Sequence, residues 1–164
     1  MIIYLKNKHS IKLDDFIFRC CVGKNGITKF KKEGDSKTPK GTFQIGNLYY
    51  RKDRVGKPKT KLKCIEIKKD MGWCDDVNSK KFYNKLIKKN PKLHHEKLFR
   101  KDHKYDLFIP IKYNFKKRIL KKGSCIFLHL TKNYKPTAGC IALNIKDFII
   151  LLKLIDKKTK IHIA

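Results

Sequence analysis

Short hydrophobic runs separated by turn residues are the feature that most constrains the fold of this chain. Six runs are rich in β-branched and aromatic residues: MIIYL, FIFRCCVG, GTFQIG, LKCIEI, YDLFIPI and SCIFLHL. Segments rich in glycine, proline and lysine, such as GDSKTPKG and VGKPK, divide them, and a last run, TKIHI, closes the chain. This pattern is typical of strands joined by turns. The alternation of LKCIEI predicts a half-exposed strand, whereas the nearly apolar SCIFLHL predicts a strand buried on both faces.

Two segments have helical spacing instead. In residues 79–89, Phe82, Tyr83, Leu86 and Ile87 recur at helical intervals and Pro91 follows, which predicts a helix there. The second helix is predicted after Asn144, which can accept the first-turn N–H groups. Its apolar stripe consists of Ile145, Phe148, Ile149 and Leu152.

The length of 164 residues and the hydrophobic fraction of 41% fit one folded domain with its own core. No repeat or linker divides the chain, so residues 1–164 are expected to form a single mainly β domain with a few helices. The less regular middle, residues 70–104, is interpreted as an insertion that shapes a site.

The formal net charge of +28 predicts an anionic partner. Only five of the 42 basic residues are arginine, and no nucleic-acid-binding motif is present. Specific nucleic-acid binding is therefore not expected, although a basic module for polyanions remains a hypothesis. No run is long enough for a membrane helix, and the N-terminus lacks the pattern of a signal peptide, which favours a cytoplasmic location or an export signal already removed.

Six cysteines are present without a C-x-x-C pair, and five of them are interpreted as small packing residues. The HHE triplet at 94–96 and His103 suggest a metal site, but the helical H-E-x-x-H spacing is missing. We expect neither a metal nor a cofactor.

The segment HLTKNYKPTAGC, from His129 to Cys140, contains the strongest chemical signal. Cys140 is either a buried structural thiol or a nucleophile whose proton His129 accepts. In the second case the N–H groups of Gly139 and Cys140 face a developing oxyanion, Thr137 adds a hydroxyl, and the Leu130 carbonyl orients the histidine ring. A nucleophilic Cys140 is further expected to be a low-pKa thiolate that is alkylated before the other five cysteines.

Several blocks in order resemble the L,D-transpeptidase (YkuD) family. They include GDSKTPKGTF, MGWCDD, GSCIFLHL and PTAGCIAL, and the resemblance extends from Val22 to about Ile163. It implies a β-sandwich-like catalytic domain, a monomer, and a location in the periplasm or cell envelope. It also implies a cysteine peptidyl transferase that acts on the tetrapeptide stems of peptidoglycan and releases D-alanine.

Carried over by position, the resemblance makes Cys140 the nucleophile, His129 the base, Leu130 the orienting residue and Gly139 part of the oxyanion hole. The chain departs from the common pattern because Ala138 replaces a second histidine and Ala142 stands where Asn or Arg is usual. The acceptor therefore stays open, as does the choice between a transpeptidase, an L,D-carboxypeptidase and a stem-binding protein without turnover.

Other residues are candidates for contacts with the stem. Trp73, Asp75 and Asp76 in MGWCDD can line the cleft, or they can form a turn around a buried tryptophan. Tyr50, Arg51 and Arg54 in YYRKDR can bind carboxylates, or the arginines can pair with Asp53 at the surface.

Overall fold

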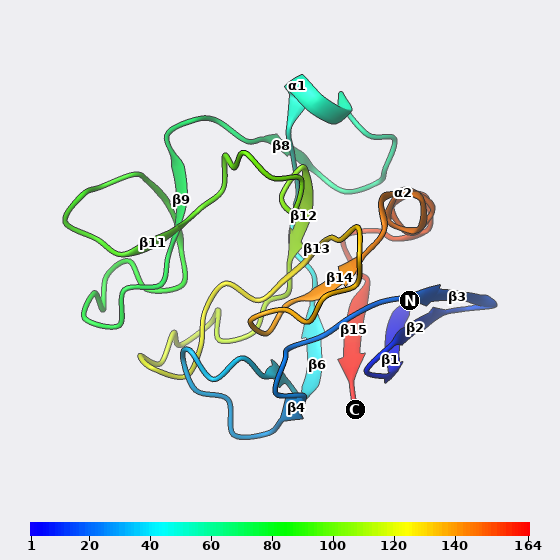
Figure 1. Cartoon of the computed structure of the whole chain (residues 1–164), viewed down its shortest axis with the longest axis horizontal. Helices are drawn as coiled ribbons and strands as arrows, with labels where there is room; N and C mark the ends of the chain where they lie inside the picture. The colour runs from blue at the N-terminus through cyan, green and yellow to red at the C-terminus, as the bar shows by residue number, and fades with distance from the viewer.

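Two five-stranded sheets form the body of the protein, as the pattern of hydrophobic runs predicts (Figure 1). The structure, a computed structural model, describes residues 1–164. The first sheet has the order β3-β2-β1-β15-β6. Its strands are β1 (Ile2–Asn7), β2 (Ser10–Leu13), β3 (Phe16–Arg19), β6 (Gly41–Gln44) and β15 (Lys160–Ile163). Because β1 and β15 pair in parallel, the two ends of the chain are joined in one sheet.

The second sheet, called the central sheet below, has the order β14-β13-β12-β7-β8. Its strands are β7 (Leu48–Tyr50), β8 (Cys64–Glu66), β12 (Leu107–Pro110), β13 (Phe127–Leu130) and β14 (Ile141–Leu143). Every residue of β13 is buried, which confirms the prediction from SCIFLHL. The edge strand β8 is half-buried throughout, in agreement with its alternating sequence.

A third sheet lies on the far side of the central sheet from β1–β3 (Figure 1). It has the order β10-β9-β11 and consists of β9 (Met71–Cys74), β10 (Leu86–Lys88) and β11 (His95–Lys97). The short strands β4 (Ile27–Thr28) and β5 (Thr38–Pro39) form a separate parallel pair. The irregular middle of the sequence thus folds as a small layer of its own.

The two faces of the central sheet belong to two different cores. In β13, Leu128 and Leu130 point into a core of 25 buried residues shared with the first sheet and α2, whereas Phe127 points into a second cluster of eight with Trp73 and Tyr105. Successive side chains of a strand alternate between faces. His129 is therefore on the Phe127 side, facing the third sheet.

Two helices are present, α1 (Lys52–Val55) and α2 (Ile145–Leu154). The helix predicted after Asn144 is confirmed: the Asn144 side chain accepts the Asp147 N–H, and Phe148, Leu151 and Leu152 are buried. Neither helix has the length and hydrophobicity that crossing a membrane requires.

The helix predicted for residues 79–89 is wrong. The segment forms turns and then β10, with Asn84 in the left-handed region at φ 54°. Tyr83 is fully buried and its hydroxyl bonds to the Glu33 carboxylate, while all of Asn84's amide contacts are to residues distant in sequence. The hydrophobic spacing thus reflects tertiary packing, which overrides the helical preference.

Replacing Asn144 should weaken the junction between β14 and α2. We expect Asn144→Ala to lower the free energy of unfolding by about 1 kcal/mol, the usual loss when a capping side chain is removed. Denaturant unfolding measures it, with Asn133→Ala as the control because the exposed Asn133 makes no side-chain hydrogen bond. Equal losses in the two variants would contradict the capping role.

Candidate active site

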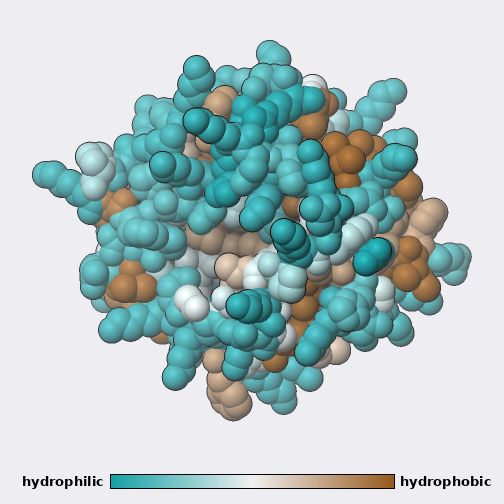
Figure 2. Space-filling model, in the orientation of Figure 1, coloured by the Kyte–Doolittle hydropathy of each residue, from teal (hydrophilic) through white to brown (hydrophobic).

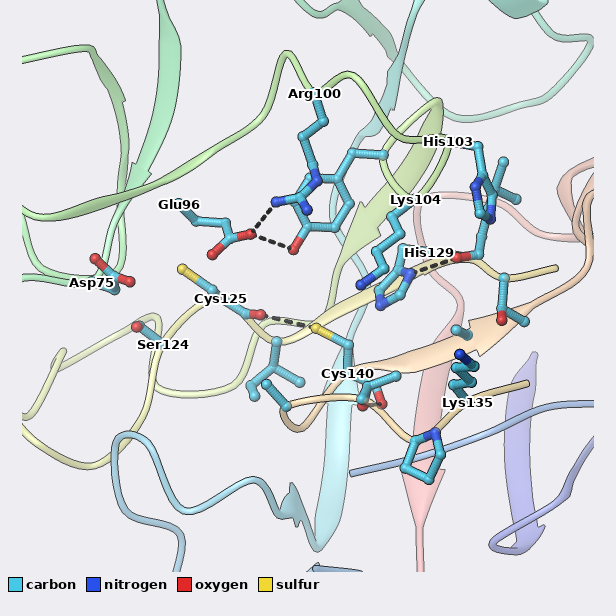
Figure 3. A pocket seen from close by; sticks show the side chains of 18 of the residues that line it. Asp75, Glu96, Arg100, His103, Lys104, Ser124, Cys125, His129, Lys135 and Cys140 are labelled. Carbon is cyan, nitrogen blue, oxygen red and sulfur yellow. Dashed lines mark hydrogen bonds and ion pairs between the residues drawn. The ribbon is translucent and has the colours of Figure 1, made fainter. Parts of the chain in front are cut away.

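A cavity of about 380 Å³ lies between the central sheet and the third sheet and holds both Cys140 and His129 (Figure 3). The surface of the protein is less hydrophilic inside a hollow than around it. Figure 2 shows a mostly hydrophilic face with paler and hydrophobic groups in a hollow near its centre.

The register of two parallel strands brings Cys140 next to His129. In the pairing of β13 with β14, Leu128 lies opposite Ile141 and His129 opposite Ala142. Cys140, one residue before Ile141, therefore lies beside Phe127, whose N–H donates to the Cys140 sulfur at 3.3 Å. Phe127 and His129 share a face of β13. The pairing of β13 with β14 thus brings together Cys140 and His129, which are eleven residues apart in the sequence.

His129 is a neutral imidazole with a fixed orientation. Its Nδ1–H donates to the Leu130 carbonyl at 2.8 Å, the hydrogen bond expected from the sequence, so Nε2 carries a free lone pair. The Tyr105 ring packs edge-on against it at 5.5 Å between centroids. Burial lowers the pKa of His129 to about 4, opposed by the Leu130 bond and assisted by the positive charge of Lys104.

Cys140 is a buried, protonated thiol. Its Sγ donates to the Cys125 carbonyl at 3.2 Å, and no hydrogen bond joins it to His129. Burial raises the pKa of Cys140 to about 12, although the bond from the Phe127 N–H partly offsets this. The thiolate expected from the sequence is therefore wrong for the resting protein, because the desolvation of the charge outweighs the nearby histidine and glycine.

The two pKa values decide how the pair can react. The raised pKa of the thiol and the lowered pKa of the imidazole both oppose transfer of the proton between them at rest. The resting pair is therefore a neutral thiol beside a neutral imidazole. Proton transfer has to accompany attack on a substrate that changes the surroundings of the sulfur.

The Thr137–Cys140 turn is fixed by its own hydrogen bonds. The Thr137 hydroxyl donates to the Cys140 carbonyl at 2.6 Å and accepts the Gly139 N–H at 3.1 Å. Within this turn the N–H groups of Ala138 and Cys140 have no partner in the protein. The sequence predicted that the N–H groups of Gly139 and Cys140 face an oxyanion. The Cys140 N–H is free to do so, whereas the Gly139 N–H already donates to the Thr137 hydroxyl. That hydroxyl in turn donates to the Cys140 carbonyl.

Gly139 cannot be replaced without moving the backbone. Its φ is 137°, and a Cβ there would stand 2.8 Å from the Lys37 carbonyl oxygen. Val22 and Lys24 form backbone hydrogen bonds to both sides of Thr137, at 2.9 and 2.8 Å. The GDSKTPKG segment, which contains Lys37, thus supports the turn that carries Cys140.

Asn84 and Cys125 were not singled out from the sequence, yet they position the thiol. Asn84 is 1% exposed; its Oδ1 accepts the Trp73 indole N–H at 3.0 Å and the Cys125 N–H at 3.2 Å. Its Nδ2 donates to the carbonyls of Tyr113 and Asn114. Cys125 has φ 54°, a conformation uncommon for a residue with a side chain, which aims its carbonyl at Cys140. The only signal in the sequence was the turn segment KKGS directly before Cys125.

The segment around β11 forms one wall of the cavity, as expected of an insertion that shapes a site. Glu96 accepts hydrogen bonds from Arg100 at 3.0 Å and from the Tyr105 hydroxyl at 3.2 Å. Arg100 also pairs with Asp102, which lowers the pKa of that carboxyl to about 2. Glu96, Arg100, Lys104 and Tyr105 line the cavity; the sequence pointed only to Glu96, and only as part of a metal site.

Of the candidates for stem contacts, Asp75 and Thr137 line the cavity, whereas Trp73 and Asp76 do not. Trp73 is buried in the second core, its indole held by Asn84. Asp76 accepts N–H groups from Asn78 and His94, so the turn interpretation holds for this residue. The exposed His94 pairs with Asp75, and no group of three potential ligands is arranged to hold a metal ion.

The residues of YYRKDR also lie outside the cavity. Tyr50 is part of the main core, and Arg51, 3% exposed, pairs with Asp53 and donates to the Arg100 carbonyl at 2.7 Å. Arg54 donates to the carbonyls of Lys101 and Asp102. These arginines hold the backbone of the wall that carries Arg100 and Lys104. For Arg51 the structure has the pairing with Asp53, which was one of the two alternatives that the sequence left open.

The carboxylates of the cavity lie on one side of it. Asp75 and Glu96 lie on the Cys125 side of the thiol, where Arg100 pairs with Glu96, whereas His103, Lys104 and Lys135 lie on the His129 side (Figure 3). His103 Nε2 is buried without a hydrogen-bond partner. The cavity therefore suits a ligand with a cationic group at one end and an anionic group at the other.

Alkylation tests the protonation state of the thiol. At neutral pH, limited iodoacetamide should label the partly exposed Cys64 well before Cys140, and the rate at Cys140 should rise about tenfold per pH unit until the pKa near 12 is approached. Peptide mass spectrometry measures both. Preferential labelling of Cys140 at neutral pH would show that the resting thiol is ionised.

Comparisons with known proteins give a family match and a structural similarity. The family model described as the L,D-transpeptidase catalytic domain (YkuD) matches residues 2–163. Among solved structures, the helical cell shape determining protein Pgp2 from Campylobacter jejuni is similar, at 17% identity and a TM-score of 0.47. The similarity covers 99% of this chain and 46% of that one, so the chain spans just under half the length of Pgp2.

No curated protein matches the chain. The family match extends over almost every residue, and the layered β architecture agrees with it. The chain therefore belongs to the YkuD family of L,D-transpeptidase catalytic domains.

Proposed function

We propose that the chain is a peptidoglycan L,D-transpeptidase that works through an acyl-enzyme on Cys140. The observation that carries the proposal is the arrangement of a buried thiol, an oriented neutral histidine and a free Cys140 N–H in one cavity. The donor substrate is a tetrapeptide stem, and a single catalytic domain of residues 1–164 contains the whole site. The family membership supports this chemistry.

The acylation step uses these groups in turn. As the donor carbonyl enters, the Cys140 thiol leaves the Cys125 carbonyl, its proton passes to His129 Nε2, and the sulfur attacks the carbonyl carbon. The Cys140 N–H donates to the oxyanion that forms. Collapse breaks the bond to D-alanine, whose nitrogen receives the proton from His129, and a thioester remains.

The second step regenerates the thiol. An amine of a second stem attacks the thioester carbon, the new amide forms as the C–S bond breaks, and the amine proton reaches the sulfur through His129. Water in place of the amine would give an L,D-carboxypeptidase. Both reactions release D-alanine. They differ in the second product, which is a crosslinked dimer for the transpeptidase and a tripeptide monomer for the carboxypeptidase.

The charged groups of the cavity orient the donor. The carboxylate of the leaving D-alanine lies toward Lys104 and Lys135, and an ammonium group on the third residue of the stem lies toward Asp75 and Glu96. The scissile bond then spans Cys140, between the two groups. This arrangement fits a stem whose third residue has an amino group in its side chain, such as diaminopimelate.

Turnover of disaccharide-tetrapeptides tests the function. We expect loss of D-alanine, a stem-sized mass on the intact protein and crosslinked dimers, all reduced at least about a thousandfold in Cys140→Ala. Cys64→Ala is the matched control, because Cys64 lies outside the cavity. Tripeptide monomers alone would indicate the carboxypeptidase. Binding that falls steeply with salt, without turnover and without an effect of Cys140→Ala, would support the polyanion-binding module instead.

Two charge-neutralising variants test the orientation of the donor. Lys104→Gln and Asp75→Asn should each raise KM about tenfold, the loss of one charge-assisted contact, while Lys59→Gln serves as a control outside the cavity. Steady-state kinetics measures this. With a C-terminally amidated stem the effect of Lys104→Gln should disappear; an undiminished effect would contradict the proposed position of the leaving group.

A further inference from the structure

A second and larger hollow adjoins the candidate active site. It has a volume of about 1080 Å³ and is formed by the loops around residues 29–34 and 113–122 together with Val77. We call it the basic groove. Its apolar part includes Phe30, Tyr113, Ile119 and Leu120, and its exposed lysines are Lys29, Lys32, Lys121 and Lys122.

The basic groove is continuous with the Cys140 cavity. Lys31, Glu33 and Gly34 line both spaces. The Lys31 ammonium is held by Asp35 and the Lys32 carbonyl, and the Glu33 carboxylate accepts hydrogen bonds from Tyr83 and Ser124. A ligand in the groove therefore has one end at the entrance to the cavity.

The shape of the groove is fixed before any ligand arrives. The two loops are joined by the Glu33 N–H, which donates to the Lys121 carbonyl at 2.8 Å. Asn114 ties the second loop internally, since its amide donates to the carbonyls of Ile119 and Gly123 and accepts the Ile119 N–H. Such ties reduce the entropy lost on binding.

Large apolar side chains in the groove are left uncovered. Phe30 is 85% exposed and Ile119 is 46% exposed, and both lie among the lysines. The one acidic residue of the groove, Glu33, already accepts two hydrogen bonds. The groove thus offers unpaired positive charge beside apolar surface, which fits an extended ligand with several carboxylates and small apolar groups.

We propose that the basic groove binds the acceptor stem peptide, the second substrate that supplies the attacking amine. This inference rests on the proposed function, because the acceptor exists only if Cys140 forms a thioester. Stem peptides have both free carboxylates and alanine methyl groups, which match the lysines and the apolar floor. Binding there brings one end of the peptide to Lys31 and Glu33 at the entrance to the cavity, from which its amine can reach the position beside His129 that D-alanine has left.

The rival occupants fit less well. Phe30 is exposed enough to insert into a lipid surface, but such insertion would not use the connection of the groove to the Cys140 cavity through Lys31 and Glu33. The groove also contains no arginine to read nucleic-acid bases or to fork onto phosphates.

Binding of a tripeptide stem fragment tests the site without turnover, because this fragment has no D-alanine to lose. Titrated into the Cys140→Ala protein, it should bind about tenfold more weakly when Lys121→Glu and Lys122→Glu are combined, and several-fold more weakly in Phe30→Ala. Lys6→Glu with Lys12→Glu is the matched control, since it makes the same change of net charge on two strands outside the groove, β1 and β2. Equal weakening in both double variants would overturn the groove as a specific site.

Turnover separates this inference from the function on which it rests. With tetrapeptide donor and tripeptide acceptor, the ratio of dimer formed to D-alanine released should fall about tenfold in the Lys121/Lys122 double variant and stay constant in the Lys6/Lys12 control. If D-alanine is released but the ratio does not change in the double variant, or if no dimer forms, the groove is not the acceptor site. The acyl-enzyme on Cys140 would still stand in that case. The absence of D-alanine release from the unaltered protein would instead contradict the proposed function. Groove variants that lose binding to anionic vesicles or to DNA, but not to the tripeptide, would assign the surface to another partner.

Discussion

The hydrogen bond from the Cys140 thiol to the Cys125 carbonyl is the constraint on which the candidate site depends. It keeps the sulfur protonated and away from His129, in surroundings where a thiolate is strongly disfavoured. The acceptor carbonyl has its direction because Cys125 is in a left-handed conformation that Asn84 holds through the Cys125 N–H. Since Asn84 also binds Trp73 and the 113–114 backbone, the same amide connects the thiol, the third sheet and the wall of the basic groove. A substrate that takes the Cys140 thiol away from the Cys125 carbonyl therefore breaks one bond of a network that Asn84 holds together.

The central sheet supports this arrangement because its two faces serve different purposes. One face completes the main core with the first sheet and α2, which fixes β13 and β14 in place. The other face carries Phe127 and His129 toward the third sheet. Strand alternation separates the two roles, so one face of the sheet can pack a hydrophobic core while the other carries the polar groups of the cavity.

The sequence predicted what local pattern determines. The β runs, the capped helix after Asn144 and the Leu130 contact of His129 all depend on neighbours in the chain or on strand periodicity. The failures involve partners far apart in sequence. Arg51 and Arg54 bind carbonyls of residues 100–102, and Tyr83 is buried against Glu33, so their spacing within YYRKDR and residues 79–89 was misleading. The pKa of Cys140 was misjudged for the same reason: burial by the third sheet cannot be seen from the residues beside it.

The two alanines that depart from the common motif both line the cavity. Ala142 is fully buried; its N–H and carbonyl both pair with Cys21, and it lies opposite His129 in the sheet. Ala142 nevertheless lines the cavity, so a longer side chain there would take up part of its volume, whereas Ala138 is exposed at the mouth. Contacts that an Asn or Arg at position 142 would offer a substrate carboxylate have to come from the opposite wall, where Lys104 and His103 face the same space. That wall is held by Arg51 and Arg54, so the arginines of YYRKDR influence carboxylate binding through the backbone that they position.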